Sequence, residues 1–223
     1  MHARRTGRRG ACTAITTVAV VAAWRRWGRP WQQRWGATDA EAAAPLPGDD
    51  LVAEPAQQVT RAIGIDAPPE AVWPWVVQLG ADRGGFYSYD WLENLFGLRI
   101  HSADRIVGEW QDLAVGDIVA ADRAVSGGWV VGHLDPGSTL GLLVADVDTR
   151  RPLDRDEQGW EFLWTFAVRP APDGGSRLVV RERTAFGKPL VRALMAPVGL
   201  VSFVMTRRML QGIKARAEAT PAT

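Results

Sequence analysis

The C-terminal segment Pro189–Ala217 constrains the fold more than any other part of this chain. Its apolar side chains recur every three or four residues, which is the period of an α-helix: Leu190, Leu194, Val198, Val201, Met205 and Met209. No charged residue occurs between Ala193 and Thr206. A helix with so little polar surface needs protein around most of its circumference, so we expect a long C-terminal helix enclosed by the rest of the domain. Arg192 and Pro197 interrupt the apolar run, which argues against a membrane-spanning helix.

The middle of the chain is predicted to form antiparallel strands. Trp160–Val168 alternates strictly, with Trp160, Phe162, Trp164, Phe166 and Val168 on one face, as expected of a half-buried strand. The turn 170–176 then leads into 177–184, so these two strands are predicted to form a hairpin. Turn residues bound four more expected strands, at 59–65, 117–121, 129–134 and 139–146. Two short helices are expected after the first of them, one beginning near Pro69 and one over 86–98.

These elements predict the α+β class in a helix-grip arrangement. A curved antiparallel sheet would wrap around the long C-terminal helix, with the two short helices after the first strand. We assign this domain to residues 59–217, a Pro- and Ala-rich linker to 36–58 and a short tail to 218–223.

Three segments carry a resemblance to a known family. They are RAIGIDAPPEAVWPWVVQLG (61–80), GGFYSYDWLENLFGL (84–98) and WEFLWTFAV (160–168). Together they resemble the START-like, polyketide cyclase and birch-pollen-allergen superfamily, over about residues 59–217. The resemblance implies a cavity between the concave face of the sheet and the final helix.

The sequence supplies apolar and sulfur-containing side chains for such a cavity. The residues that we expect to bind a ligand are Phe86, Tyr87, Tyr89, Trp91, Trp129, Phe162, Trp164, Phe166, Met195, Phe203, Met205 and Met209. The alternative is that these side chains simply fill the core. If they line a cavity, the expected partner is a hydrophobic small molecule or lipid, and no cofactor is expected.

Polar groups in the cavity would orient a ligand or perform acid–base chemistry. His133 shares the phase of Trp129 and Val131, and Glu182 shares that of Leu178 and Val180. This phase favours an inward position for both, with Arg181 or Arg183 as the partner of Glu182; the alternative is that both side chains are solvated. The other polar candidates are Tyr87, His101, Glu161 and Arg181. The histidines are too scattered in the sequence to predict a metal site.

Residues 1–35 form a basic segment that differs from the rest of the chain. They contain eight arginines and no acid, which leaves 18 basic against 25 acidic residues from Gly36 onward. Residues 10–24 are uncharged, and Trp24, Trp27, Trp31 and Trp35 follow at helical spacing among arginines. Tryptophan with arginine is typical of a membrane interface, so one interpretation is a membrane anchor through residues 10–35 on an otherwise cytoplasmic protein. A signal peptide, packing on the domain and disorder are the alternatives.

Three functions follow from this sequence. The first is binding of a hydrophobic small molecule or lipid. The second is a cyclase or dehydratase that uses a His or Glu in the pocket, and the third is an accessory protein-interaction domain with a filled groove. Nucleic acid is not expected as a partner, because the acidic domain would repel phosphate. No G-x-S-x-G sequence, Walker loop or second cysteine supports nucleophilic or nucleotide chemistry.

Overall fold

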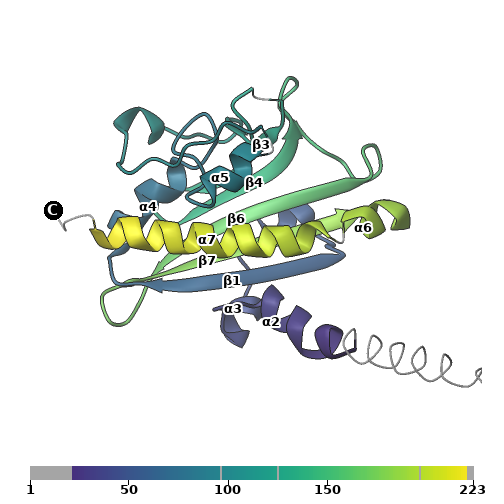
Figure 1. Cartoon of the computed structure of the whole chain (residues 1–223), viewed down its shortest axis with the longest axis horizontal. Coiled ribbons are helices and arrows are strands. Elements are labelled where there is room, and N and C mark those ends of the chain that lie inside the picture. The colour runs from purple at the N-terminus through teal and green to yellow at the C-terminus, as the bar shows by residue number, and fades with distance from the viewer. Residues whose placement is uncertain (1–21, 96, 125, 196, 220–223) are drawn as a thin grey trace, which may run out of the picture.

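A seven-stranded antiparallel sheet forms the framework of the protein (Figure 1). The computed structural model describes residues 22–219 with the exception of 96, 125 and 196, so residues 10–21 of the predicted anchor lie outside the described residues. The strand order is β1–β7–β6–β4–β3–β2, and β5 pairs with β4. The strands are β1 (Gln57–Ile65), β2 (Ile118–Ala120), β3 (Gly128–Asp135), β4 (Thr139–Asp146), β5 (Arg151–Pro152), β6 (Trp160–Pro170) and β7 (Ser176–Phe186).

The alternating segment forms the hairpin that its sequence predicts. β6 pairs with β7 over its whole length, from Trp160 opposite Phe186 to Pro170 opposite Ser176. Phe166 and Val168 pack into the main core, whereas Leu163 and Ala167 belong to apolar clusters on the other face. The period of two therefore places the aromatic residues on the concave, inner face of the sheet.

The helices lie on both sides of this sheet. They are α2 (Arg29–Gln33), α3 (Asp39–Ala43), α4 (Pro69–Val77), α5 (Asp90–Leu95), α6 (Pro189–Met195) and α7 (Val198–Ala219), with one π-helical turn, η1 (Trp24–Gly28), and two 3-10 turns, η2 (Asp49–Val52) and η3 (Gly108–Trp110). In Figure 1, α7 crosses the inner face, α4 and α5 cover one end of it, and α2 and α3 lie beyond β1. The predicted α+β helix-grip fold is confirmed.

The long C-terminal helix differs from its prediction in two respects. It is broken into α6 and α7, bent by 47° near Pro197, because a proline cannot continue the helical hydrogen bonds. The second half of α7 is enclosed, with Met209, Leu210 and Ile213 buried, but α6 and the first turns of α7 expose most of their apolar side chains. The expectation that protein surrounds most of the circumference of this helix is wrong for this first part. No single described helix is long and apolar enough to cross a bilayer. Helices α6 and α7 have the required length and apolarity only when they are taken together.

The second short helix is also shorter than predicted. Helix α5 begins at Asp90, whereas residues 86–89 are not helical, because Tyr87 has a φ of 54° and turns the chain. This turn inserts the Tyr87 side chain into the core, where it lies edge-to-face with Trp75 at 5.8 Å between ring centroids.

Residues 36–58, which composition suggests as a linker, pack on the outer face of the sheet. Helix α3 begins with a capping box between Thr38 and Glu41. The buried Arg181 guanidinium then holds the segment, donating to Asp49 at 2.6 Å and to the carbonyl oxygens of residues 41, 42 and 44. Arg181 therefore serves the outer face and does not reach the inner one.

Candidate functional site

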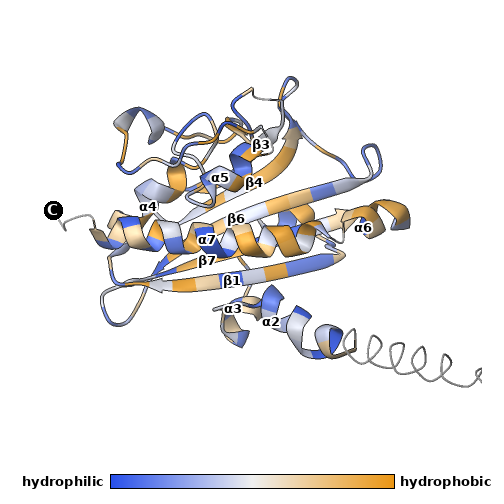
Figure 2. Cartoon of the chain, in the orientation of Figure 1, coloured by the Kyte–Doolittle hydropathy of each residue, from blue (hydrophilic) through white to orange (hydrophobic). Residues whose placement is uncertain are grey.

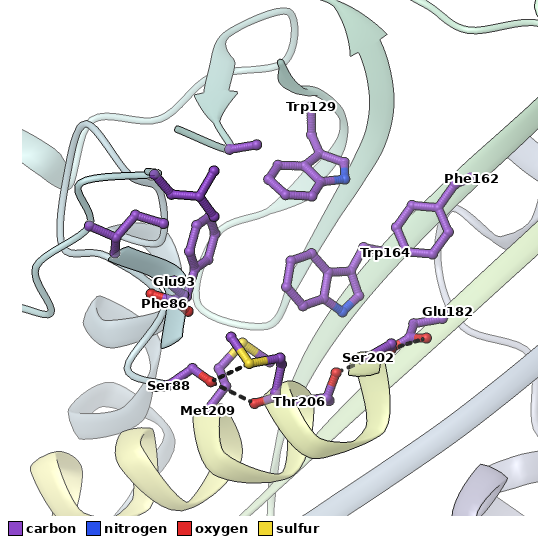
Figure 3. Close-up of a pocket in the computed structure, with 14 residues that line it drawn as sticks. Phe86, Ser88, Glu93, Trp129, Phe162, Trp164, Glu182, Ser202, Thr206 and Met209 are labelled. Atoms are coloured by element: carbon purple, nitrogen blue, oxygen red, sulfur yellow. Dashed lines mark hydrogen bonds between the residues drawn. The ribbon is translucent and has the colours of Figure 1, made fainter. Parts of the chain in front are cut away.

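A cavity of about 330 Å³ lies between α7 and the inner face of the sheet (Figure 3). The sheet contributes aromatic rings from β3 and β6, and the chain between β1 and β2 contributes the wall opposite to them. The lining residues are Phe86, Ser88, Glu93, Leu98, Ile100, Ala121, Trp129, Phe162, Trp164, Glu182, Ser202, Met205, Thr206 and Met209. Most of the surface that they present to the cavity is apolar.

The aromatic part of the wall is a connected group of rings. Trp129 of β3 and Trp164 of β6 lie 5.5 Å apart between centroids, and Phe86 meets Trp129 edge-to-face at 5.8 Å. Leu142 of β4 pairs with Trp164, and Val131 of β3 pairs with Leu142. This register brings the indoles of β3 and β6 to the same face across β4. Rings that support one another in this way make a wall of defined shape.

Helix α7 contributes one face of four residues to the cavity. Ser202, Met205, Thr206 and Met209 are spaced three, one and three apart, so they lie on a single side of the helix. The Ser88 hydroxyl donates to the Met205 carbonyl oxygen at 3.2 Å and approaches the Met205 sulfur at 3.6 Å. The flexible thioethers of Met205 and Met209 suit an apolar site that adapts to its contents.

Among the described lining residues, Glu182 is the one whose charge is neutralised by a salt bridge. Its Oε1 accepts from Arg61 Nη1 at 2.7 Å, and the Ser202 hydroxyl donates to it at 2.8 Å. Thr206 donates to the same oxygen at 3.1 Å. Arg61 is 2% exposed and also donates to the Gln32 carbonyl oxygen at 3.2 Å. The carboxylate is therefore satisfied by the protein and requires no cation from a ligand.

This arrangement corrects the predicted partner of Glu182. Arg181 and Arg183 alternate with Glu182 along β7 and therefore point to the outer face, where Arg183 donates to the Val52 carbonyl oxygen. Arg61 reaches Glu182 because β1 pairs with β7, with Val59 opposite Glu182 and Arg61 opposite Val180. A diagonal neighbour on the adjacent strand thus supplies the charge.

His133 does not face the cavity, and a β-bulge explains why. Val131 lies opposite Leu142, but His133 lies opposite Gly141, so Gly132 is an extra residue in β3. One extra residue moves the side chain of every later residue in the strand to the opposite face of the sheet. The His133 side chain consequently lies on the outer face next to Gly48, with Nε2 3.0 Å from Asp135 Oδ2.

The other polar candidates also lie outside the cavity. The His101 side chain is 92% exposed and lies 3.6 Å from the Asp90 carboxylate. Glu161 is 3.8 Å from Arg155, and burial raises its pKa. Tyr87 lies in the core under the Arg216 guanidinium, and burial raises the pKa of its phenol.

The structure separates the twelve expected ligand-binding residues into two groups. Six line the cavity: Phe86, Trp129, Phe162, Trp164, Met205 and Met209. The other six do not: Tyr87, Tyr89, Trp91, Phe166, Met195 and Phe203. Phe166 is fully buried behind Trp164, Trp91 is 68% exposed, and Phe203 packs edge-to-face on Trp31 at 5.4 Å.

Sequence reasoning missed several lining residues, among which Glu93 has the greatest chemical interest. Glu93 is 4% exposed, and its Oε2 has no hydrogen-bond partner among the described residues. Burial, together with the nearby Asp90 charge, raises the pKa of Glu93 to about 7. Ser202 and Thr206 could have been predicted, because each lies three residues before a predicted methionine, Met205 or Met209, on the same helical face. No periodic pattern points to Glu93, which the chain around α5 brings to the cavity.

The fold and the cavity together define a helix-grip protein with an apolar interior site. No family model matches the chain, and no curated protein matches its sequence.

Several solved structures share its overall arrangement at low similarity. A protein from Mesorhizobium loti is 17% identical, with a TM-score of 0.42 over 74% of this chain and 100% of that one. A protein from Mycobacterium smegmatis is 15% identical, with a TM-score of 0.45 over 74% and 93%. Norcoclaurine synthase from Thalictrum flavum is 13% identical, with a TM-score of 0.43 over 74% and 95%. This level of similarity carries no argument about function.

Proposed function

We propose that this protein binds a hydrophobic small molecule or lipid in the cavity beneath α7, as a member of the START-like, polyketide cyclase and birch-pollen-allergen superfamily. The observation that carries the proposal is the nature of the cavity wall. It is built from aromatic, aliphatic and thioether groups, and the charge of Glu182 is compensated by Arg61. Replacing the water against such a wall with the apolar surface of a ligand lowers the free energy.

The size of the cavity supports a single small guest. A volume of about 330 Å³ is at the lower end of the range of small-molecule sites. A ligand that buries about 300 Å² of apolar surface gains about 7 kcal/mol before the entropic costs of binding. Because the entropic costs reduce this gain, dissociation constants between about 10 μM and 1 mM are expected for a ligand without specific polar contacts.

The experiment is a titration of the full chain with the apolar fluorophore N-phenyl-1-naphthylamine. Ala121 lines the cavity with a small side chain, so Ala121→Phe fills part of the space. Ala124, three residues further on, is exposed, so Ala124→Phe is the matched control. We expect Ala121→Phe to weaken probe binding at least tenfold and Ala124→Phe to leave it unchanged, with both variants folded by circular dichroism. Equal binding by all three proteins would refute the proposal.

A second function, a cyclase or dehydratase activity, is favoured by Glu93. A buried carboxyl group with a pKa of about 7 beside a cavity can exchange protons near neutral pH. If Glu93 is a general acid or base, Glu93→Gln abolishes conversion of a bound substrate but retains its binding. For a pure binding protein, the molecule extracted from the wild type and from Glu93→Gln is the same. The accessory role requires a filled groove, which the open cavity does not provide.

A further inference from the structure

Exposed apolar side chains gather over α6 and the first turns of α7. They are between 41% and 70% exposed and comprise Leu190, Leu194, Val198, Leu200, Val201 and Val204. Figure 2 shows this part of the chain as largely hydrophobic. We call these six residues the α6–α7 apolar face. A contiguous exposed patch of this kind marks a surface that contacts something other than water.

The tryptophans of the N-terminal segment adjoin this face. Trp24, Trp27 and Trp31 are 45%, 67% and 56% exposed. Gln32 Nε2 donates to the Gly199 carbonyl oxygen at 2.7 Å, and the Trp31 ring meets the Phe203 ring edge-to-face. These two contacts hold α2, which directly follows η1, against the beginning of α7. The indoles and the α6–α7 apolar face therefore belong to one end of the molecule.

The charges that the two segments themselves carry at this end are basic, although the exposed acids Asp154, Asp156 and Glu157 precede Gly159, which lies next to Val191 of α6. The sequence contains no acid in residues 1–38 or in residues 183–217. Arg25, Arg26 and Arg29 are exposed among the tryptophans, and Lys188 and Arg192 are exposed on or next to α6. On α7, Arg207 and Arg208 follow the apolar residues, and their guanidinium groups lie over Trp35 and Tyr89. An apolar centre with a cationic border is complementary to a bilayer that contains anionic lipid.

We propose that this end of the molecule docks on a membrane surface rich in anionic lipid, with the α6–α7 apolar face and the tryptophans inserted at the interface. Indole rings prefer the depth of the headgroups, and residues 10–24, which lead into η1, carry no charge. A second copy of the chain is a poorer occupant, because two surfaces whose charges are predominantly basic repel each other.

Docking in this orientation would bring the cavity close to lipid. On α7, Ser202 and Met205 line the cavity, while their neighbours Val201 and Val204 point outward. A single helix then separates the cavity from the bilayer. This inference goes beyond ligand binding and does not depend on it, because docking uses the outer side of α7.

The test is flotation of the full chain with vesicles of phosphatidylcholine alone or with 30% phosphatidylglycerol. The face variant is Leu194→Ser/Leu200→Ser. Its matched control is Ile106→Ser/Val115→Ser, which changes two exposed apolar residues far from the face in sequence. We expect wild type to float with the anionic vesicles, the face variant to bind about tenfold more weakly, and the control to bind within twofold of wild type. Arg25→Gln/Arg26→Gln/Arg29→Gln should weaken binding about fivefold for each arginine removed, at low salt.

Three results would overturn the proposal. The first is wild type that does not float, and the second is a face variant that floats as well as wild type. The third is a wild-type dimer in buffer that the face variant makes monomeric, because a second copy would then cover the face. Ala121→Phe should float normally, so failure of ligand binding and failure of docking are distinguishable.

Discussion

Removal of the Glu182 carboxylate should destabilise the protein far more than removal of the whole Arg61–Glu182 pair. The Arg61 side chain is 2% exposed and that of Glu182 is 11% exposed, with 2.7 Å between Nη1 and Oε1. In Glu182→Leu, the guanidinium stays buried without its anion, which costs about 3–5 kcal/mol of unfolding free energy. In Arg61→Met/Glu182→Leu, no buried charge remains, so the expected loss is only about 1–2 kcal/mol.

The assay is urea unfolding at pH 7, followed by tryptophan fluorescence for both single variants and the double variant. The difference between the double variant and the summed single variants gives the coupling energy of the pair. The Arg34–Asp39 pair provides the control, because it has the same 2.7 Å separation but exposed side chains. Arg34→Met should therefore change the midpoint very little.

Two outcomes would refute this reasoning. One is Glu182→Leu with nearly wild-type stability, which would mean that water reaches Arg61. The other is a double variant as unstable as the sum of the two single variants, which would mean that the two side chains are not coupled.

Two further predictions concern Glu93 and the packing of α7. Burial raises the pKa of Glu93 from its ordinary value of 4.5 to about 7. Between pH 4.5 and pH 7, this carboxyl group is therefore protonated in the folded protein and ionised in the unfolded chain. Stability should therefore fall as pH rises through this window, and Glu93→Gln should be more stable than wild type by about 3 kcal/mol at pH 8 but not at pH 4; parallel urea midpoints across this range would contradict this. At Gly212, an added Cβ would collide with the Tyr87 carbonyl oxygen, so Gly212→Ala should lower stability by about 1–3 kcal/mol in thermal unfolding despite the better helix propensity of alanine. Gly199→Ala in the same helix meets no atom within 4 Å and should not lower it, so equal losses in the two variants would show that α7 is not packed on Tyr87.

The strands and the final helix could be predicted because their signals are local. The alternation of Trp160–Val168 gives both the strand and the face of Trp164, and the apolar period from Leu190 to Met209 gives the helix. The bulge at Gly132 could not be predicted in the same way. It depends on pairing with β4, and it transfers His133 to the outer face.

The cavity could be predicted only in outline, since its polar corner depends on contacts between distant segments. Arg61 and Glu182 are 121 residues apart and meet only through the register of β1 with β7. Ser202 and Thr206 share the helical face that the methionines indicate. Glu93 and Ala121 reach the cavity through the irregular chain between β1 and β3, for which periodicity gives no information. The exposure of Leu194 on α6 and of Leu200 on α7 depends on which sides of the two helices the rest of the protein covers.

Native mass spectrometry of the gently purified full chain tests the central claim most directly. A hydrophobic guest in the cavity should add the mass of one small molecule to the chain, and Ala121→Phe should reduce the occupied fraction while Ala124→Phe retains it. An unliganded chain that also fails to take up added fatty acid or N-phenyl-1-naphthylamine would contradict the account. So would a guest that Ala121→Phe retains in full.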